Sequence, residues 1–134
     1  MKALIIEDDK ANQFILQQFL TPFGGAQVAS NGEQGLEEFR KALDGQIPFD
    51  LICLDIMMPG MDGLQVLKEL RREEAERGII GADGAKIIMI TAVNDKNVVI
   101  SAFQDGCEAF LIKPLNHEDL MRNLKALKLI ADSK

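Results

Sequence analysis

The sequence predicts an α/β fold, in which a five-stranded, mainly parallel sheet carries helices on both of its faces. Two observations lead to this fold class. First, five short segments of strand character alternate with five segments of helical period along the chain. Second, four of the strand segments are apolar at successive positions, which is typical of strands buried on both faces of a parallel sheet. Because a single helix separates each strand from the next, the crossovers are expected to be right-handed.

The five expected strands differ in how apolar they are. Four are short apolar runs rich in branched side chains: residues 3–6, 51–54, 87–90 and 110–112. The fifth, residues 26–30, is apolar only at alternate positions, which fits an edge of the sheet.

The segments between the strands have the period of amphipathic helices. In the first of them, Phe14, Ile15, Gln18 and Phe19 fall at helical spacing, which predicts one face of that helix. The last begins after Asn116, a residue type that caps helices. The five expected helices span residues 12–20, 32–43, 63–77, 94–104 and 116–131.

The chain has 134 residues and a mass of 14.8 kDa, the size of one ordinary domain. The third helix passes through a wholly charged turn at residues 71–74, and residues 78–84 are expected to form an extended loop. No linker or repeat interrupts the pattern, so residues 1–134 are predicted to be a single domain without an output domain. The end of the chain soon after the last helix is expected to be its natural end; excision from a longer protein is the alternative.

The composition excludes several classes of protein. Fifteen basic and 21 acidic residues give a net charge of −6, which argues against binding to nucleic acid or to an anionic membrane. Two cysteines provide no disulfide framework, and a single histidine rules out a histidine-based metal cluster. No apolar run reaches the roughly 18 residues of a membrane span. Acidic residues at positions 7–9 interrupt the first apolar run, so it is not a signal peptide. We therefore expect a reduced, cytoplasmic protein.

The residues with chemical potential lie directly after the apolar strands. In an open parallel sheet, ligands bind beyond the carboxyl ends of the strands. Carboxylates that converge there repel one another unless a cation joins them, and oxygen ligands suit Mg²⁺. A carboxylate oxygen in such a site could attack phosphorus in line. The residues that end four of the strands are Glu7-Asp8-Asp9, Asp55, Thr91 and Lys113-Pro114.

These residues resemble those of the receiver domain of two-component response regulators. The resemblance covers nearly the whole chain, and its most specific part is the pattern D-x-M-M-P-x-M-D-G over residues 55–63. It implies a doubly wound (βα)5, flavodoxin-like fold with strand order 2-1-3-4-5. The other segments that carry it are residues 4–9, 90–92 and 110–114.

The resemblance implies a phosphoacceptor and a metal site. Asp55 matches the aspartate that is phosphorylated, and Glu7 and Asp8 match the acidic pair that positions Mg²⁺ (or Mn²⁺), with Asp8 as the direct ligand. Asp8 with Asp9 is the competing alignment; Asp9 alone is expected to cap the first helix. The backbone carbonyl of Met57 would complete the protein ligands, so its side chain is not required.

The resemblance also implies the residues that read out phosphorylation. Lys113 would pair with a phosphoryl oxygen, and its bond to Pro114 would be cis. Thr91 would donate a hydrogen bond to another oxygen, and the small Ala92 would leave room for the phosphoryl group. Phe110 matches the aromatic switch residue, which moves together with Thr91 and reshapes the face made by the fourth helix, fifth strand and fifth helix.

Several residues near the predicted site have less specific expectations. Met57 and Val93 are both apolar and cannot orient an attacking water, so slow self-dephosphorylation is our hypothesis. Cys53 and Cys107 are expected to behave as small buried hydrophobes. His117 is expected to be a solvated turn residue at the start of the last helix.

The function implied by the resemblance is that of a stand-alone response regulator receiver. It would accept a phosphoryl group from a phosphohistidine of a sensor histidine kinase or a histidine phosphotransfer protein, and would signal to an unknown downstream protein. It would act as a monomer or as a phosphorylation-dependent dimer, and it would not be an enzyme for an external substrate. The basic set on the last helix, expected to be its solvated face or a pairing surface, is Arg122, Lys125 and Lys128.

Two other functions fail on particular residues. A hydrolase with an aspartate nucleophile would need a general acid two residues after Asp55, where this chain has Met57. A flavin or nucleotide carrier would need a loop that holds phosphate after the first strand. The three acids at residues 7–9 would repel phosphate there.

Overall fold

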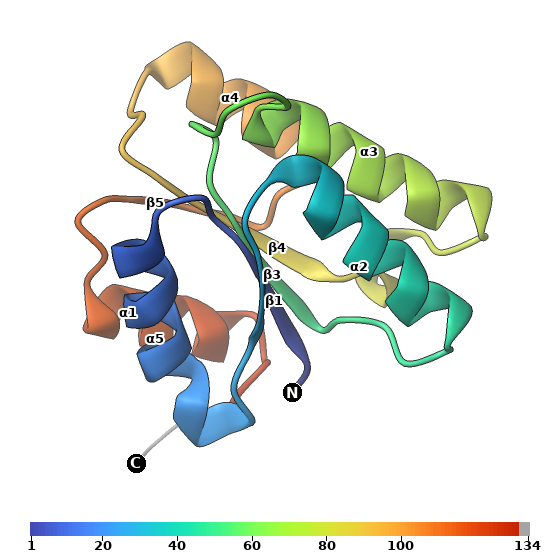
Figure 1. Ribbon diagram of the computed structural model, residues 1–134, viewed down its shortest axis with the longest axis horizontal. Helices are drawn as coiled ribbons and strands as arrows, with labels where there is room; N and C mark the ends of the chain where they lie inside the picture. The colour runs from blue at the N-terminus through green and yellow to red at the C-terminus, as the bar shows by residue number, and fades with distance from the viewer. Residues whose placement is uncertain (132–134) are drawn as a thin grey trace.

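The computed structural model describes residues 1–131 and contains one five-stranded parallel sheet (Figure 1). The strand order β2-β1-β3-β4-β5 confirms the predicted order. Residues 132–134, which the predicted domain includes, lie outside the described residues. The strands are β1 (Ala3–Ile6), β2 (Gln27–Ala29), β3 (Leu51–Leu54), β4 (Lys86–Thr91) and β5 (Ala109–Ile112).

Within the described residues, four α-helices and two short 3-10 helices connect the strands, and a fifth α-helix follows β5. Within residues 1–131, none of these helices combines the length and the apolar character that a bilayer crossing requires. The helices are α1 (Lys10–Leu20), α2 (Gly32–Asp44), α3 (Gly63–Glu76), α4 (Lys96–Gln104) and α5 (His117–Ala126), with η1 (Thr21–Phe23) and η2 (Gly81–Asp83). The 3-10 helix η2 lies in the segment that was predicted to be an extended loop.

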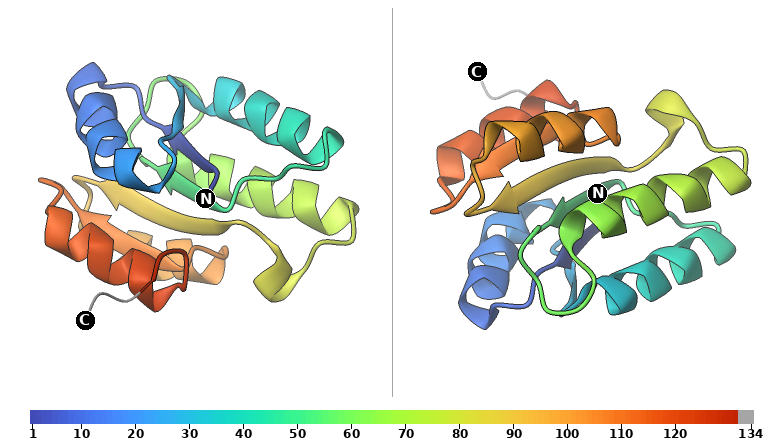
Figure 2. Two further views of the ribbon diagram at one scale, coloured as in Figure 1. Left: turned by 90° about the horizontal axis from the view of Figure 1, so that it is seen from below. Right: turned by 90° about the horizontal axis from the view of Figure 1, so that it is seen from above.

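Helices cover both faces of the sheet, and a separate core lies under each set. On one face Leu36 and Phe39 of α2 pack with Leu67 of α3, in the core that also includes Ala102 of α4. The other core contains buried leucines of α1 and α5. Figure 2 shows α2 and α3 side by side, in agreement with their direct contacts. The two-sided burial explains why the central strands are apolar at every position.

The helix α1 differs from the sequence prediction in the face that it buries. It packs through Leu16 and Leu20, whereas Phe14 and Ile15 have exposed fractions of 61% and 40%. Phe19 is only partly buried against the same core. The periodicity of the short helix allowed two overlapping apolar faces, and the sheet selected the one that contains the two leucines.

The helix α5 ends five residues before the predicted position. Lys128 adopts a left-handed conformation with φ of 60°, and its N–H donates to the Lys125 carbonyl at 3.0 Å. The N–H of Leu129 donates to the Leu124 carbonyl at 2.9 Å. These two bonds form a Schellman motif, which ends a helix by satisfying its last carbonyls. Leu127 and Ile130 still pack on the core, which is why the apolar period continues beyond the helix.

Candidate functional site

Two neighbouring strands end beside each other and bring acidic residues together. The N–H of Asp55 donates to the carbonyl of Ile6 at 3.1 Å, which continues the pairing of β1 with β3. Carboxylate oxygens of Glu7, Asp8 and Asp55 lie within 4.8 Å of one another. We call these three residues the acid cluster. Glu7 and Asp55 are buried, and Asp8 is exposed.

The ammonium group of Lys113 lies between the two buried acids. Its Nζ is 2.6 Å from Glu7 Oε1 and 3.1 Å from Asp55 Oδ2. The Lys113 N–H donates to the Thr91 carbonyl at 2.8 Å, and the bond from Lys113 to Pro114 is cis, as the resemblance implied. The end of β5 thus supplies the cation to acids that come from β1 and β3.

Burial and hydrogen bonding act in opposite directions on the pKa of Glu7 and on that of Lys113. Burial raises the pKa of the Glu7 carboxyl, and its hydrogen bond with Lys113 opposes that rise. Burial acts to lower the pKa of Lys113, but its hydrogen bonds to Glu7 and Asp55 outweigh this effect and raise that pKa. Three carboxylates facing one ammonium group leave an excess of negative charge.

The donor set of the acid cluster fits a hard divalent cation. Clustered carboxylate oxygens are the ligands that Mg²⁺ prefers in proteins, and a second positive charge would offset the excess of acid. Asp9 lies outside the cluster: its Oδ2 accepts a bond from the Asn12 N–H at 3.0 Å and caps α1. This engagement of Asp9 favours the pair Glu7 and Asp8 over the pair Asp8 and Asp9.

The segment after β3 is held tightly against the acid cluster. The N–H of Met57 donates to Asp55 Oδ1 at 3.2 Å, while the Met57 side chain is 66% exposed. At Gly63, a Cβ atom would lie 2.1 Å from the Asp55 carbonyl oxygen, so only glycine fits there. This close approach explains the last residue of the D-x-M-M-P-x-M-D-G pattern.

The residues expected to read out phosphorylation occupy the ends of β4 and β5. Thr91 is fully buried, and its Oγ1 accepts a bond from the Val93 N–H at 3.4 Å. Ala92 is exposed. Phe110 is partly buried and packs, as Val93 does, against the core under α2, α3 and α4.

Sequence reasoning missed a residue that holds the loop of the acidic pair. Gln13 of α1 donates from Nε2 to the Glu7 carbonyl at 2.6 Å and to Ser30 Oγ at 3.3 Å. It thereby ties the loop after β1 to the loop after β2. Its position one turn after Asp9 was visible in the sequence, but the partner Ser30 is distant along the chain.

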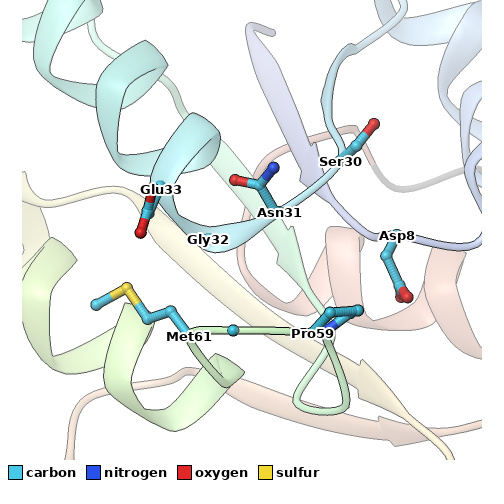
Figure 3. A pocket seen from close by; sticks show the side chains of 8 residues that line it. Asp8, Ser30, Asn31, Gly32, Glu33, Pro59 and Met61 are labelled. Atoms are coloured by element: carbon cyan, nitrogen blue, oxygen red, sulfur yellow. The ribbon is translucent and has the colours of Figure 1, made fainter.

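A pocket of about 400 Å³ adjoins the acid cluster (Figure 3). Asp8 lies at its edge and is shared with the acid cluster. A Cβ atom at Gly32 would lie 2.5 Å from Val66 Cγ2, so the start of α2 approaches α3 closely there. The pocket keeps open space next to the exposed carboxylate of the three. Its lining comes from three loops and the first residues of α2: Asp8, Ser30, Asn31, Gly32, Glu33, Pro59, Gly60 and Met61.

Comparison with known families and proteins agrees with this geometry. The sequence profile described as "Response regulator receiver domain" matches residues 3–125. The chemotaxis protein CheY of Bacillus subtilis is 30% identical over 122 residues, which cover 90% of this chain and 91% of CheY. The transcriptional regulatory protein AfsQ1 of Streptomyces coelicolor is 35% identical, over 92% of this chain and 49% of AfsQ1. The chain spans about half the length of several such curated relatives.

Solved structures show the same architecture. A two-component response regulator from Clostridium difficile has a TM-score of 0.78 at 29% identity, over 99% of both chains. CheY in the CheX-CheY-BeF3-Mg complex from Borrelia burgdorferi has a TM-score of 0.81, over 96% of this chain and 89% of that chain. At 24% identity, the latter similarity concerns the fold alone.

Proposed function

The chain belongs to the response regulator receiver domain family of two-component signalling, and from this premise we propose that it is a switch phosphorylated on Asp55. The observation that carries the proposal is the position of the Asp55 carboxylate. It is buried, it lies within 4.8 Å of two further acids, and its Oδ2 is 3.1 Å from the Lys113 ammonium. A nucleophilic carboxylate next to a fixed cation and a metal-binding oxygen set suits phosphoryl transfer.

In the proposed transfer, an oxygen of Asp55 attacks the phosphorus of a phosphohistidine. The new O–P bond forms as the P–N bond breaks, and the histidine nitrogen keeps the electron pair of that bond. When the other ring nitrogen of the phosphohistidine carries a proton, the imidazole therefore leaves as a neutral group. Bound Mg²⁺ would supply positive charge to the phosphoryl oxygens. The groups that would hold the ion are the carboxylates of Glu7, Asp8 and Asp55 and the backbone carbonyl of Met57.

Lys113 and Thr91 are proposed to bind the transferred group. The ammonium group already lies beside Asp55, so a phosphoryl oxygen on Asp55 would come within its reach. Thr91 would donate its hydroxyl proton to a second oxygen, and Ala92 would leave the space for the group. Phe110, half-buried on the neighbouring strand, would then repack with Thr91, so that phosphorylation biases two arrangements of the α4-β5-α5 face.

The partners follow from this chemistry. We infer that the phosphodonor is a sensor histidine kinase or a histidine phosphotransfer protein, and that the signal leaves through contact with a downstream protein. The chain would catalyse its own phosphorylation and dephosphorylation without acting on an external substrate. We also propose that the protein is stand-alone and cytoplasmic. It would be a monomer or would pair through the α4-β5-α5 face when phosphorylated.

The test uses a small phosphodonor such as phosphoramidate with Mg²⁺, followed by intact-mass analysis. We expect one phosphoryl group on the wild-type protein and none on Asp55→Ala or on wild type with a chelator. Asp9→Asn is the matched control, because Asp9 caps α1 outside the acid cluster, and it should still be phosphorylated. An adduct that persists in Asp55→Ala, or a wild-type protein that gains none, would overturn the proposal.

A further inference from the structure

Met57 differs from the other methionines in its exposure to solvent. Its exposed fraction is 66%, whereas Met58 and Met89 are buried at 8% and 0%. Met1, Met61 and Met121 are partly buried. A peroxide must reach the sulfur to oxidise it, so exposure determines which thioether reacts first.

The two thiols do not compete for the oxidant. Cys53 and Cys107 are both buried and unpaired. Cys53 is 1% exposed, and burial raises the pKa of the Cys107 thiol to about 11. Protonated, buried thiols are unreactive because the thiolate is the nucleophile. Among the described residues, the sulfur of Met57 is therefore the one most accessible to an oxidant in solution.

The same residue borders the carboxylate that we propose is phosphorylated. Its N–H donates to Asp55 Oδ1 at 3.2 Å, and the N–H groups of Met58 and Gly63 both donate to the Ile56 carbonyl, at 3.1 and 2.9 Å. These bonds fix the backbone of the loop, so the Met57 side chain starts from a backbone position whose N–H contacts the Asp55 carboxylate. With Ile56, Met58, Pro59 and Asp62 it lines a pocket of about 350 Å³.

We propose that Met57 is a peroxide-sensitive modification site, at which oxidation of the thioether to the sulfoxide shortens the lifetime of the phosphoryl group on Asp55. The sulfur attacks one oxygen of a hydroperoxide, the O–O bond breaks, and the second oxygen leaves with the proton as water or an alcohol. The sulfur is oxidised by two electrons and the peroxide is reduced by two.

The consequence comes from the polarity of the product. A thioether is a weak hydrogen-bond acceptor, whereas a sulfoxide carries a strongly polar oxygen. That oxygen would accept a hydrogen bond from a water next to the acyl phosphate and orient it for attack on phosphorus. Since the side chain is exposed, its oxidation leaves both cores intact. The effect on lifetime rests on the proposed phosphorylation of Asp55.

The first experiment measures where oxidation occurs, without any phosphodonor. The native protein is treated with dilute hydrogen peroxide, digested, and its peptides are analysed by mass spectrometry over time. We expect Met57 to be oxidised before Met58, Met61 and Met89. Oxidation of any of these three ahead of Met57 would overturn the proposed site.

The second experiment measures the decay of the phosphorylated protein with and without prior peroxide. We expect decay to accelerate about tenfold, which corresponds to about 1.4 kcal/mol, one well-placed hydrogen bond at the barrier. Methionine sulfoxide reductase should restore the original rate. Met61→Leu should respond to peroxide as wild type does, and Met57→Leu should show no response, whatever its starting rate.

The outcomes separate this inference from the proposed function. Protein that never gains a phosphoryl group on Asp55 contradicts the proposed function, and the effect on lifetime falls with it. Protein that is phosphorylated but decays at the same rate after oxidation of Met57 contradicts only this inference. An equal peroxide response in Met57→Leu would also overturn it, because another residue would then be responsible.

Discussion

Two clusters of charged side chains lie at opposite ends of the strands and are paired in different ways. At the carboxyl ends, the Lys113 ammonium group bonds to two of the three carboxylates of the acid cluster, those of Glu7 and Asp55. At the amino ends of β4 and β5, Arg71 of α3 bonds to both Glu74 and Glu108; we call these three residues the arginine network. The acid cluster has three carboxylates for one cation, whereas the arginine network has two carboxylates for one cation.

The arginine network is satisfied in detail by the backbone around it. Arg71 also donates to the carbonyl oxygens of Ala85 and Gly106, at 2.8 Å and at 2.7 to 3.0 Å. Glu74 accepts from the Ala85 N–H at 2.7 Å, and Glu108 accepts from the Ile87 N–H at 2.6 Å. The acid cluster differs from this network in its third carboxylate, Asp8, which is exposed and leaves room for a second cation.

The largest effect is expected from Arg71→Met, which should lower the free energy of unfolding by about 3 kcal/mol, because Glu74 and Glu108 lose their cation. Arg72→Met is the matched control, since Arg72 is an exposed neighbour whose ion pair contributes little. Urea denaturation followed by circular dichroism measures both. Equal losses of stability in both variants would show that the arginine network contributes no more than an exposed ion pair. Glu108→Gln is a milder change than Arg71→Met, and its loss of stability should lie between those of Arg71→Met and Arg72→Met.

The acid cluster should respond to a cation, which the arginine network should not. Mg²⁺ at about ten times its dissociation constant should raise the free energy of unfolding of the wild type by about 1.4 kcal/mol. The same Mg²⁺ should do much less for Asp8→Asn. Thermal unfolding with Mg²⁺ or with chelator measures the shift. Equal stabilisation of wild type and Asp8→Asn would place the ion elsewhere.

Removing one charge from the acid cluster should stabilise the metal-free protein. Without a metal, the free energy of unfolding of Asp8→Asn should exceed that of wild type by about 1 kcal/mol, because the substitution relieves repulsion among like charges. Its urea midpoint should therefore be higher. Glu74→Gln in the arginine network should instead be destabilising, because a buried acceptor pairs with both Arg71 and the Ala85 N–H. Two variants that shift stability in the same direction would remove the contrast between the clusters.

The smallest expected effect is on the pH dependence of stability. The pKa of Glu7 is raised in the folded protein, so the folded state holds this proton more strongly than the unfolded state does. The stability that this protonation adds is present below pH 4.5, the ordinary pKa of a glutamate carboxyl, and is lost as the pH rises through the pKa of Glu7 in the folded protein. With chelator present, Glu7→Gln should lack this loss. Urea midpoints at several pH values would show it; an identical pH profile for both proteins would contradict it.

Much of the site could be predicted from the sequence because its residues directly follow apolar strands. Once the strands are parallel, the positions of Glu7, Asp55 and Lys113 follow from topology. The arginine network was not predicted, because residues 71–74 looked like a uniformly charged turn. Which of those side chains is buried depends on partners near Ala85 and Glu108, which only the folded chain brings close.

The helix boundaries show a similar division. The α1 face was predicted wrongly, since a short helix with many apolar residues allows two faces and the fit to the sheet selects one. The end of α5 was predicted too late, because Leu127 and Ile130 continue the apolar period after the helix has ended. Local periodicity therefore located the helices but not the details of their ends or of their packing.

The Lys113 ammonium bonds to acids that lie 106 and 58 residues earlier in the chain. A growing polypeptide thus carries its repelling acids out of the ribosome long before their counterion has been made. The ion pairs of the site require β5 to lie at the edge of the sheet, because Lys113 directly follows that strand. An incomplete chain that lacks β5 and the residue after it would hold Glu7 and Asp55 without the cation that they share.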